Sequence, residues 1–172
     1  MFECRVVVAA VVEGLAEAVM DALARGVAKR DFPPPKGLKQ TVFMMANPLA
    51  TPKPEIYETG ISCVSLDDSR WLRCQVKATA LLGAVLLKHE GNQAGADEVV
   101  LFRDGYLTES SASNIAAVKN GVILCPPMDN LILGGITYEL MIELARKHSR
   151  EFMVAPEEIK HSCCYIRKPA GK

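Results

Sequence analysis

The order of apolar and polar positions along the chain predicts a mixture of helices and strands. Near the start, Leu15, Val19 and Leu23 recur at every fourth position, which is typical of a helix. The apolar run Val6–Val12 is equally compatible with a buried strand, because periodicity alone does not separate the two. Prolines then flank Thr41–Ala46, which has the pattern of a strand between loops.

The rest of the chain shows a further strand pattern and two helix patterns. Residues Ile61–Leu66 alternate as in a strand. Four apolar side chains then recur at helical spacing: Leu81, Leu82, Val85 and Leu86. Gly91 and Gly95 mark the end of the helix that they predict. Another helix is predicted from about Tyr138 to Lys147, directly after Gly134-Gly135-Ile136-Thr137.

Two dipeptides between apolar runs predict tight hairpins, Asp104-Gly105 and Asn120-Gly121. Both dipeptides tolerate the positive φ angles that two-residue turns require. The strands that they join are Val99–Arg103 with Tyr106–Glu109, and Ile115–Lys119 with Val122–Leu124. Strands, helix, hairpins and helix in this order predict a mixed domain of the α/β or α+β class.

Composition and charge narrow the class of protein. The chain has 172 residues, 49% of them apolar, which is enough for one domain or a large domain with an appendage. Its 20 basic and 20 acidic residues leave no net charge, which argues against nucleic acid as a partner. The longest apolar run, Val6–Val12, is too short for a membrane span or a signal peptide. We therefore expect a globular, cytoplasmic protein that does not bind membranes.

The 6 cysteines predict reduced thiols, since the sequence shows no secretion signal. They form no Cys-x-x-Cys pair of the kind that binds zinc. His161 with Cys163 and Cys164 offers at most a partial metal site, because a metal ion needs three or four ligands. A buried strand with small apolar cysteines is the better interpretation, and no metal is expected.

Lys77 is the first of three features that together suggest a chemistry. It lies between Val76 and Ala78, just before the predicted apolar helix. A lysine that apolar surroundings keep neutral can form a Schiff base. Most lysines beside apolar residues instead extend to water, so Lys77 by itself indicates little.

Glu109 is the second feature, at the end of the strand after the Asp104-Gly105 turn. A carboxylate at a strand end can hold the ring nitrogen of a cofactor in its protonated form, although such a glutamate is more often solvated. A run of small polar residues follows, and its hydroxyl and N–H groups are able to face an anion. Ser111 and Ser113 are therefore candidate cofactor contacts.

The third feature is Gly134-Gly135-Ile136-Thr137, which enters the last predicted helix. Glycines let a ligand approach the backbone closely, and the first N–H groups of a helix attract anions. The same sequence is also an ordinary way to begin a helix. Together the three features match the aldehyde, the ring nitrogen and the phosphate of pyridoxal phosphate (PLP).

Several segments resemble the class IV PLP-dependent aminotransferases, and within them the D-amino-acid (D-alanine) transaminases. The lysine segment is RWLRCQVK, residues Arg70–Lys77, followed by Leu81-Leu82-Gly83. The other similar segments are Arg25–Pro33, Arg103–Asn114 and Asn130–Thr137. The resemblance extends from about residue 25 to about residue 166, and several motifs in family order are more specific than any one of them.

The resemblance implies a role for each feature. Lys77 would carry the covalent link to PLP and move a proton between substrate and cofactor. Glu109 would bind the pyridine nitrogen and keep it protonated. Ile136 and Thr137 would bind the phosphate through their N–H groups and the Thr137 hydroxyl.

The resemblance also implies the fold and two further contacts. Leu133 would pack against the cofactor ring, and Arg30 would help to hold the substrate carboxylate. The fold would be the large C-terminal PLP-binding domain of a D-amino-acid aminotransferase, spanning residues 25–172 and incomplete at its C-terminus. Residues 1–24 would be a remnant or replacement of the small N-terminal lobe, whose absence would leave an apolar face exposed.

The implied activity is transfer of an amino group between an amino acid, such as D-alanine, and a 2-oxo acid, in a homodimer. Two alternatives stay open: an inactive or weakly PLP-binding remnant, and a PLP lyase similar to aminodeoxychorismate lyase. Several positions depart from the family pattern, among them Ala112, where serine is common, and Arg167-Lys168-Pro169, where serine or threonine is expected. Phe32 stands where histidine is frequent, Ser110 where glycine is common, and Tyr138 where arginine is usual.

Overall fold

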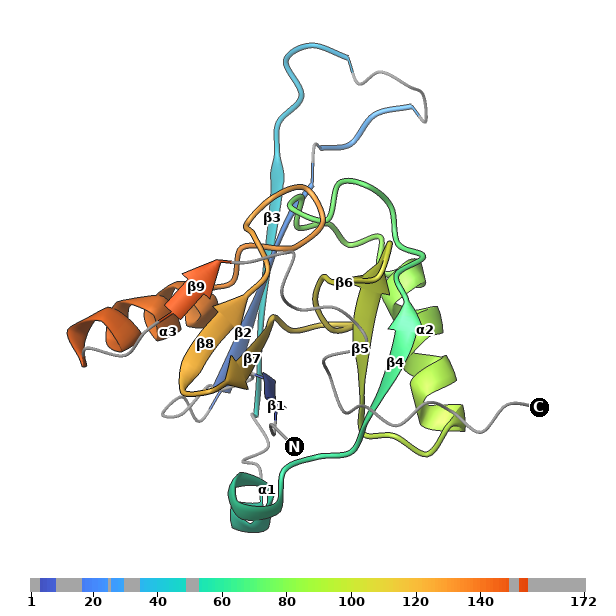
Figure 1. Ribbon diagram of the computed structural model, residues 1–172. Helices are drawn as coiled ribbons and strands as arrows, with labels where there is room; N and C mark the ends of the chain where they lie inside the picture. Colours follow the sequence, from blue (N-terminus) through green and yellow to red (C-terminus); the bar gives the residue numbers. More distant parts are fainter. Residues whose placement is uncertain are drawn as a thin grey trace. The chain divides into compact units, whose positions relative to one another are not determined.

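The computed structural model describes residues 4–8, 17–24, 26–29, 35–48, 53–148 and 152–154 (Figure 1). The chain forms two compact units, one of Met1–Val11 with Glu55–Lys172 and one of Val12–Pro54. The lobe boundary expected near residue 25 stays a prediction. Within the described ranges, no helix is long and apolar enough to cross a membrane.

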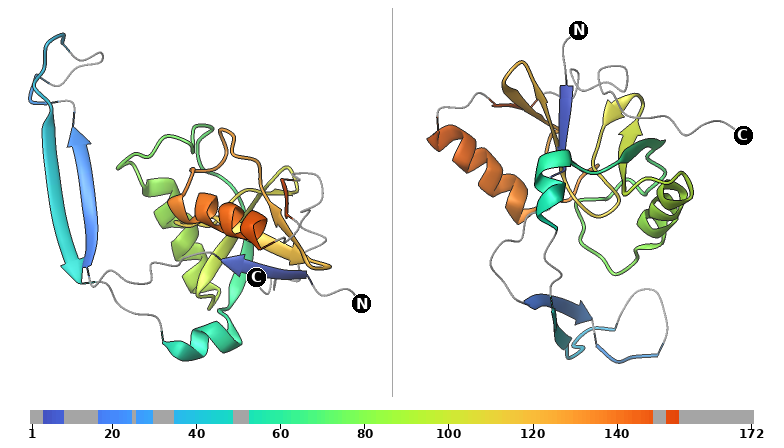
Figure 2. Two further views of the ribbon diagram at one scale, coloured as in Figure 1. Left: turned by 90° about the vertical axis from the view of Figure 1, so that its left-hand side faces the viewer. Right: turned by 90° about the horizontal axis from the view of Figure 1, so that it is seen from below.

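The smaller unit contains an antiparallel ribbon of β2 (Glu17–Ala24) and β3 (Thr41–Pro48), drawn side by side in Figure 2. The strand expected around Thr41–Ala46 is confirmed. The helix expected over the first 25 residues is wrong, because β2 occupies its second half. A spacing of four also places Val19 and Leu23 on one face of a strand, since four is a multiple of the strand period of two. Pairing with β3 therefore decides the structure.

One sheet of the larger unit has the order β4-β5-β6. Its strands β4 (Cys63–Asp67) and β5 (Glu98–Arg103) are parallel, and β6 (Tyr106–Leu107) is antiparallel to β5. The helix α2 (Leu82–Gln93) connects the two parallel strands and packs against both. The expected strand at 61–66 and the expected helix are confirmed, and they form a β-α-β unit.

The expected apolar stripe of α2 does not face this sheet. Leu82 is 71% exposed and Leu86 is 53% exposed, whereas Leu87 and Gly91 are buried. Gly91 lies inside the helix and does not end it; a Cβ there would be 2.4 Å from Cγ1 of Val99. The helix is therefore confirmed, but it packs through Leu87 and Gly91 and not through its apolar stripe.

The second sheet of this unit has the order β1-β7-β8-β9. β1 (Cys4–Val8) and β8 (Val122–Cys125) pair antiparallel with β7 (Ile115–Lys119), and β9 (Phe152–Val154) is parallel to β8. The strand alternative for Val6–Val12 is thus the correct one over its first part. The sequence did not indicate β9 or the short helix α1 (54–59).

Both hairpins are confirmed. Asp104 and Asn120 have a φ of 53°, and the glycines that follow them also have positive φ. β6 ends at Leu107, two residues earlier than expected. Thr108 and Glu109 nevertheless stay paired with Leu101, since Thr108 N–H donates to the Leu101 carbonyl and Leu101 N–H donates to the Glu109 carbonyl.

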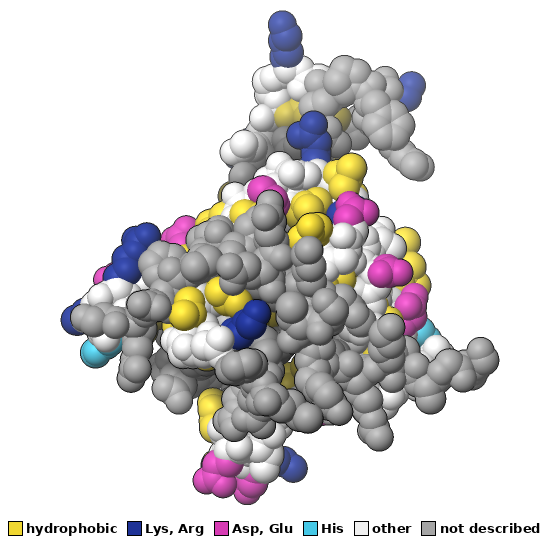
Figure 3. Space-filling view, in the orientation of Figure 1, with side chains coloured by type: hydrophobic (Ala, Val, Ile, Leu, Met, Phe, Trp, Pro, Cys, Tyr) yellow, Lys and Arg dark blue, Asp and Glu magenta, His cyan; other side chains and the backbone are white. Residues whose placement is uncertain are grey.

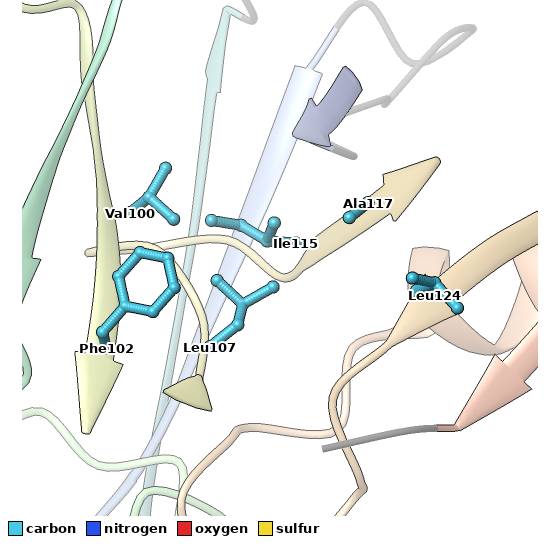
Figure 4. Close-up of a cluster of buried hydrophobic side chains, with 6 residues drawn as sticks. All are labelled: Val100, Phe102, Leu107, Ile115, Ala117 and Leu124. Carbon is cyan, nitrogen blue, oxygen red and sulfur yellow. The ribbon is translucent and has the colours of Figure 1, made fainter. Parts of the chain in front are cut away.

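The two sheets of this unit share a core. Figure 4 shows side chains from β5 and β6 turned toward side chains from β7 and β8: Val100, Phe102, Leu107, Ile115, Ala117 and Leu124. The opposite face of β5 packs through Val99 and Leu101 against Leu87 of α2. β5 is therefore buried on both faces, which explains its unbroken apolar sequence.

The last helix, α3 (Ile136–Lys147), covers the second sheet. It begins two residues before the expected position. Tyr138 is 2% exposed and packs against Ala116 and Cys125, and its hydroxyl donates to the Pro126 carbonyl over 2.7 Å. Tyr138, which replaces the family arginine, thus belongs to the core. Cys63, Cys74 and Cys125 are free thiols, as expected.

Candidate functional site

Glu109 is a buried carboxylate that receives donors from three separate segments. Its residue is 5% exposed. Oε1 pairs with Nη1 of Arg70, in the loop after β4. Oε2 accepts the N–H of Leu133 at 3.1 Å and Nδ2 of Asn114 at 3.3 Å. The sequence left open whether Glu109 is solvated, and the structure shows that it is not.

The protonation of Glu109 reflects two opposing effects. Burial raises its pKa, while the hydrogen bonds from Arg70 and the Leu133 N–H lower it, and burial is the larger effect. Burial also disfavours the charge of Arg70. Its hydrogen bonds to Asp68 and Glu109 outweigh this, so the pKa of Arg70 is raised above its usual value. Glu109 is therefore a carboxylate with enhanced affinity for a proton.

A second carboxylate lies behind Arg70. Asp68 accepts Nε and Nη2 of Arg70, each at 2.8 Å, and the Thr108 hydroxyl at 2.9 Å. Nη2 of Arg103 is 3.3 Å from the same carboxylate. Burial is the largest single effect and would raise the pKa of Asp68, but the hydrogen bonds and charge of Arg70 and the hydrogen bond from Thr108 together outweigh it, so the pKa is lowered.

The sequence did not identify Asp68, Arg70 or Asn114 as site residues. Arg70 belongs to the lysine segment that carries the resemblance, but 39 positions separate it from Glu109. Pattern and spacing contain no signal for a pair so far apart. The one indication in the sequence was that Arg70 is a charged residue within the segment that resembles the family.

Lys77 lies in the loop between β4 and α2, and its side chain is exposed. The loop is attached to the segment before α3, because Cys74 N–H donates to the Asn130 carbonyl over 2.8 Å and Nδ2 of Asn130 donates to the Leu72 carbonyl over 3.0 Å. The adjacent Val76 is 47% exposed. The structure thus places Lys77 at the surface of this unit and not in an apolar pocket.

The start of α3 presents backbone N–H groups without a side-chain cap. Gly135 is the N-cap residue, with extended backbone, and its helix end has no side-chain hydrogen bond. A Cβ at Gly135 would be 2.1 Å from Oδ1 of Asn114, so only glycine fits. Ile136 is exposed and Thr137 is half-buried. These first-turn donors have no intrahelical partner and suit an anion.

Leu133 joins Glu109 to this helix end. Its N–H donates to Glu109, and its carbonyl accepts Nδ2 of Asn114 at 2.7 Å. Because Leu133 precedes α3 by only three positions, the structure brings Glu109 into the neighbourhood of Ile136 and Thr137.

The Ser111 hydroxyl has a partner within the protein, the contact of Ser113 with a cofactor stays a prediction, and Arg30 is not described. The Ser111 hydroxyl donates to Glu98 of β5 over 2.9 Å, and the Ser113 carbonyl accepts the N–H of Ser110 at 2.9 Å. These bonds hold the turn that carries Glu109. Arg30 lies outside the described residues.

A hollow of about 250 Å³ lies beside Arg103, Thr108 and Leu131. Its lining does not include Lys77, Glu109 or Thr137. The candidate site therefore rests on the contacts of Glu109 and on the start of α3. Among the described residues, no group of three or more His, Cys, Asp or Glu is arranged for a metal ion. His161, Cys163 and Cys164 lie outside the described residues.

Comparison with known proteins places these contacts in a family. Residues 5–162 match the model of amino-transferase class IV. The chain belongs to this family. It is 35% identical over 130 residues to the D-alanine aminotransferase of Bacillus licheniformis, covering 76% of this chain and 46% of that enzyme. The matched part of this chain thus spans less than half the length of that relative.

Solved structures of the family share the fold. The branched-chain amino acid aminotransferase of Escherichia coli superposes with a TM-score of 0.65 at 26% identity, covering 79% of this chain and 47% of that one. A hypothetical aminotransferase from Mycobacterium tuberculosis, in its PLP-bound form, superposes with a TM-score of 0.68 at 20% identity, covering 85% and 52%. The mixed α/β fold of the class IV family is therefore confirmed.

Two features of this class IV family member fit PLP, the cofactor that the family implies. The buried Glu109 carboxylate suits a protonated ring nitrogen. The start of α3, whose first N–H groups meet no side-chain cap, suits a phosphate. Glu109, Ile136 and Thr137 are therefore the residues that would hold the cofactor.

Proposed function

We propose that this chain is the PLP-binding part of a transaminase, which transfers an amino group between an amino acid, D-alanine or a similar one, and a 2-oxo acid. The observation that carries the proposal is the buried Glu109 carboxylate, joined through Leu133 to the uncapped start of α3. The name of the Bacillus licheniformis relative supports D-alanine as the donor.

When bound, PLP supplies an aldehyde that reacts with amines and a ring that withdraws electrons. Glu109 would accept a hydrogen bond from the protonated ring nitrogen, and its burial excludes the water that would compete for that contact. Oε2 already accepts two donors, whereas Oε1 accepts one among the described residues, from Arg70, so Oε1 has the greater remaining capacity.

Ile136 and Thr137 would hold the phosphate through their backbone N–H groups, aided by the positive end of the α3 dipole. The Thr137 hydroxyl would add a further donor. Lys77 would provide the amine that holds the cofactor and would move a proton at the substrate Cα. Arg30 for the substrate carboxylate, the homodimer and the cytoplasmic location stay predictions.

The first experiment adds PLP to the purified chain, records the visible absorbance, reduces with borohydride and locates the adduct by peptide mass spectrometry. We expect a shifted band and a label on Lys77. Lys77→Ala should abolish both, whereas Lys147→Ala, which removes an exposed lysine at the end of α3, should leave both unchanged.

A label scattered over surface lysines, or no band, would reject the proposal and favour the remnant that has lost its cofactor. A specific label would justify a screen with D- and L-alanine and 2-oxoglutarate. That screen also separates transamination from the lyase alternative, which releases no amino-transfer product.

A further inference from the structure

Asp68 is the most completely enclosed charged side chain beside Glu109, and the proposed function gives it no role. Its side chain has 0% exposure. It follows β4 directly, and its backbone N–H donates to the Phe102 carbonyl of β5 over 2.7 Å. The carboxylate faces two guanidinium groups, those of Arg70 and Arg103, and the Thr108 hydroxyl. A buried carboxylate with this many partners is fixed in position.

The contact between Asp68 and Arg70 fixes the direction of the guanidinium. Asp68 occupies Nε with one oxygen and Nη2 with the other. A guanidinium is planar, so this two-point contact sets its plane and turns Nη1 to the opposite side. There Nη1 meets Oε1 of Glu109, while Nη2 also donates to the Leu131 carbonyl over 3.3 Å.

Arg70 therefore divides its charge between two carboxylates. Among the described residues, the charged or titratable groups that act on Glu109 are Arg70, Asp68 and the buried thiol of Cys74, while Arg103 lies beside Asp68. If Asp68 were neutral, Arg70 would act on Glu109 alone, and Arg103 would lose its nearby anion. Glu109 would then hold a proton less strongly.

We propose that Asp68 is a positioning residue: it shares the Arg70 guanidinium with Glu109, so that the Glu109 carboxylate remains a better proton acceptor than it would be beside an arginine of its own. The benefit to the ring nitrogen rests on the proposed function. The sharing itself is a property of the chain without cofactor.

The test is a carbon-13 NMR titration of the Glu109 carboxyl group in the chain without PLP. Asp68→Asn removes the charge and retains the shape, so the Glu109 midpoint should fall by about one pH unit or more. Arg103→Gln removes the positive charge on the other side of Asp68, so the midpoint should rise. Asp104→Asn changes an exposed turn residue whose positive φ suits asparagine, and it should leave the midpoint in place.

Charge sharing predicts that the Glu109 midpoint falls in Asp68→Asn and rises in Arg103→Gln. A loosened structure would instead shift the midpoint of both variants in the same direction. An unchanged midpoint or a rise in Asp68→Asn would overturn the proposal. If Asp68→Asn does not fold, a fall or no change in Arg103→Gln overturns it independently. The titration needs no PLP, so it can succeed when Lys77 fails to bind cofactor, and the two proposals fail separately.

Discussion

Asn114 shows how one neutral side chain holds two parts of the site. Nδ2 donates to the Leu133 carbonyl and to Glu109, while Oδ1 fills the space where a side chain at Gly135 would lie. The same residue therefore ties the carboxylate to the start of α3 and limits what can stand there. A substitution at Asn114 or at Gly135 therefore alters the packing of the other residue.

Gly135→Ala tests this coupling. The new Cβ would displace Asn114 and break its hydrogen bonds, so we expect a loss of about 1–3 kcal/mol in the free energy of unfolding. Adding Asn114→Ala removes the clash, so the double variant should lose less than the sum of the two single variants. Urea unfolding measures all three.

Gly134→Ala is the matched control. Its Cβ would be 3.1 Å from the terminal Cε of Met128, which is a flexible group. We expect a smaller loss than in Gly135→Ala. An equal loss in both variants would show that glycine flexibility, and not contact with Asn114, determines this segment.

At the scale of elements, β5 organises the larger unit because it is buried on both faces. One face meets the second sheet and the other meets α2. The close approach of α2 depends on Gly91, whose missing side chain makes room for Val99. The helix thus packs through Leu87 and Gly91 and leaves its apolar stripe exposed.

Gly91→Ala should therefore destabilise the chain although alanine favours helices. We expect a loss of about 1–3 kcal/mol in the free energy of unfolding. The new Cβ would overlap Cγ1 of Val99, so the helix or the Val99 side chain would have to move. Gly83→Ala, in the same helix, has its nearest neighbour at an ordinary 3.5 Å and should be neutral or stabilising by up to about 1 kcal/mol. Thermal or urea unfolding that ranks the two variants the other way would contradict this packing.

At the scale of the whole molecule, large apolar side chains are exposed in both units. Val42, Phe43 and Met44 are exposed on β3, and Leu82 and Leu86 on α2. Yellow side chains reach the surface in several places in Figure 3. A two-stranded ribbon is marginal by itself, so these exposed side chains favour association.

We expect the chain to self-associate in a concentration-dependent manner. Leu82→Lys with Leu86→Lys should weaken association at least tenfold, because each removes exposed apolar area that association would bury. His89→Lys, at an exposed polar position of α2, is the control and should have no effect. Sedimentation velocity at increasing concentration measures this, and a monomer at all concentrations would contradict it.

Family membership and the local elements could be predicted from the sequence. The Asp-Gly and Asn-Gly turns, α2 and α3 depend on short-range preferences, so their residues were sufficient. The helix expected over the first 25 residues is wrong where β2 forms, because apolar residues four positions apart fit the period of a strand as well as that of a helix. Motifs in family order indicated Lys77, Glu109 and Thr137 but not how these residues are surrounded.

The sequence by itself determined family membership and most of the local elements, the two hairpins, α2 and α3 among them, and it indicated candidate site residues. Only the tertiary structure decided that Glu109 is buried, that Arg70 lies between Glu109 and Asp68, and that α2 packs through Gly91. The physical reason is distance along the chain. Periodicity and turn preferences act over a few residues, whereas burial and ion pairing join residues tens of positions apart and exist only after the strands have packed.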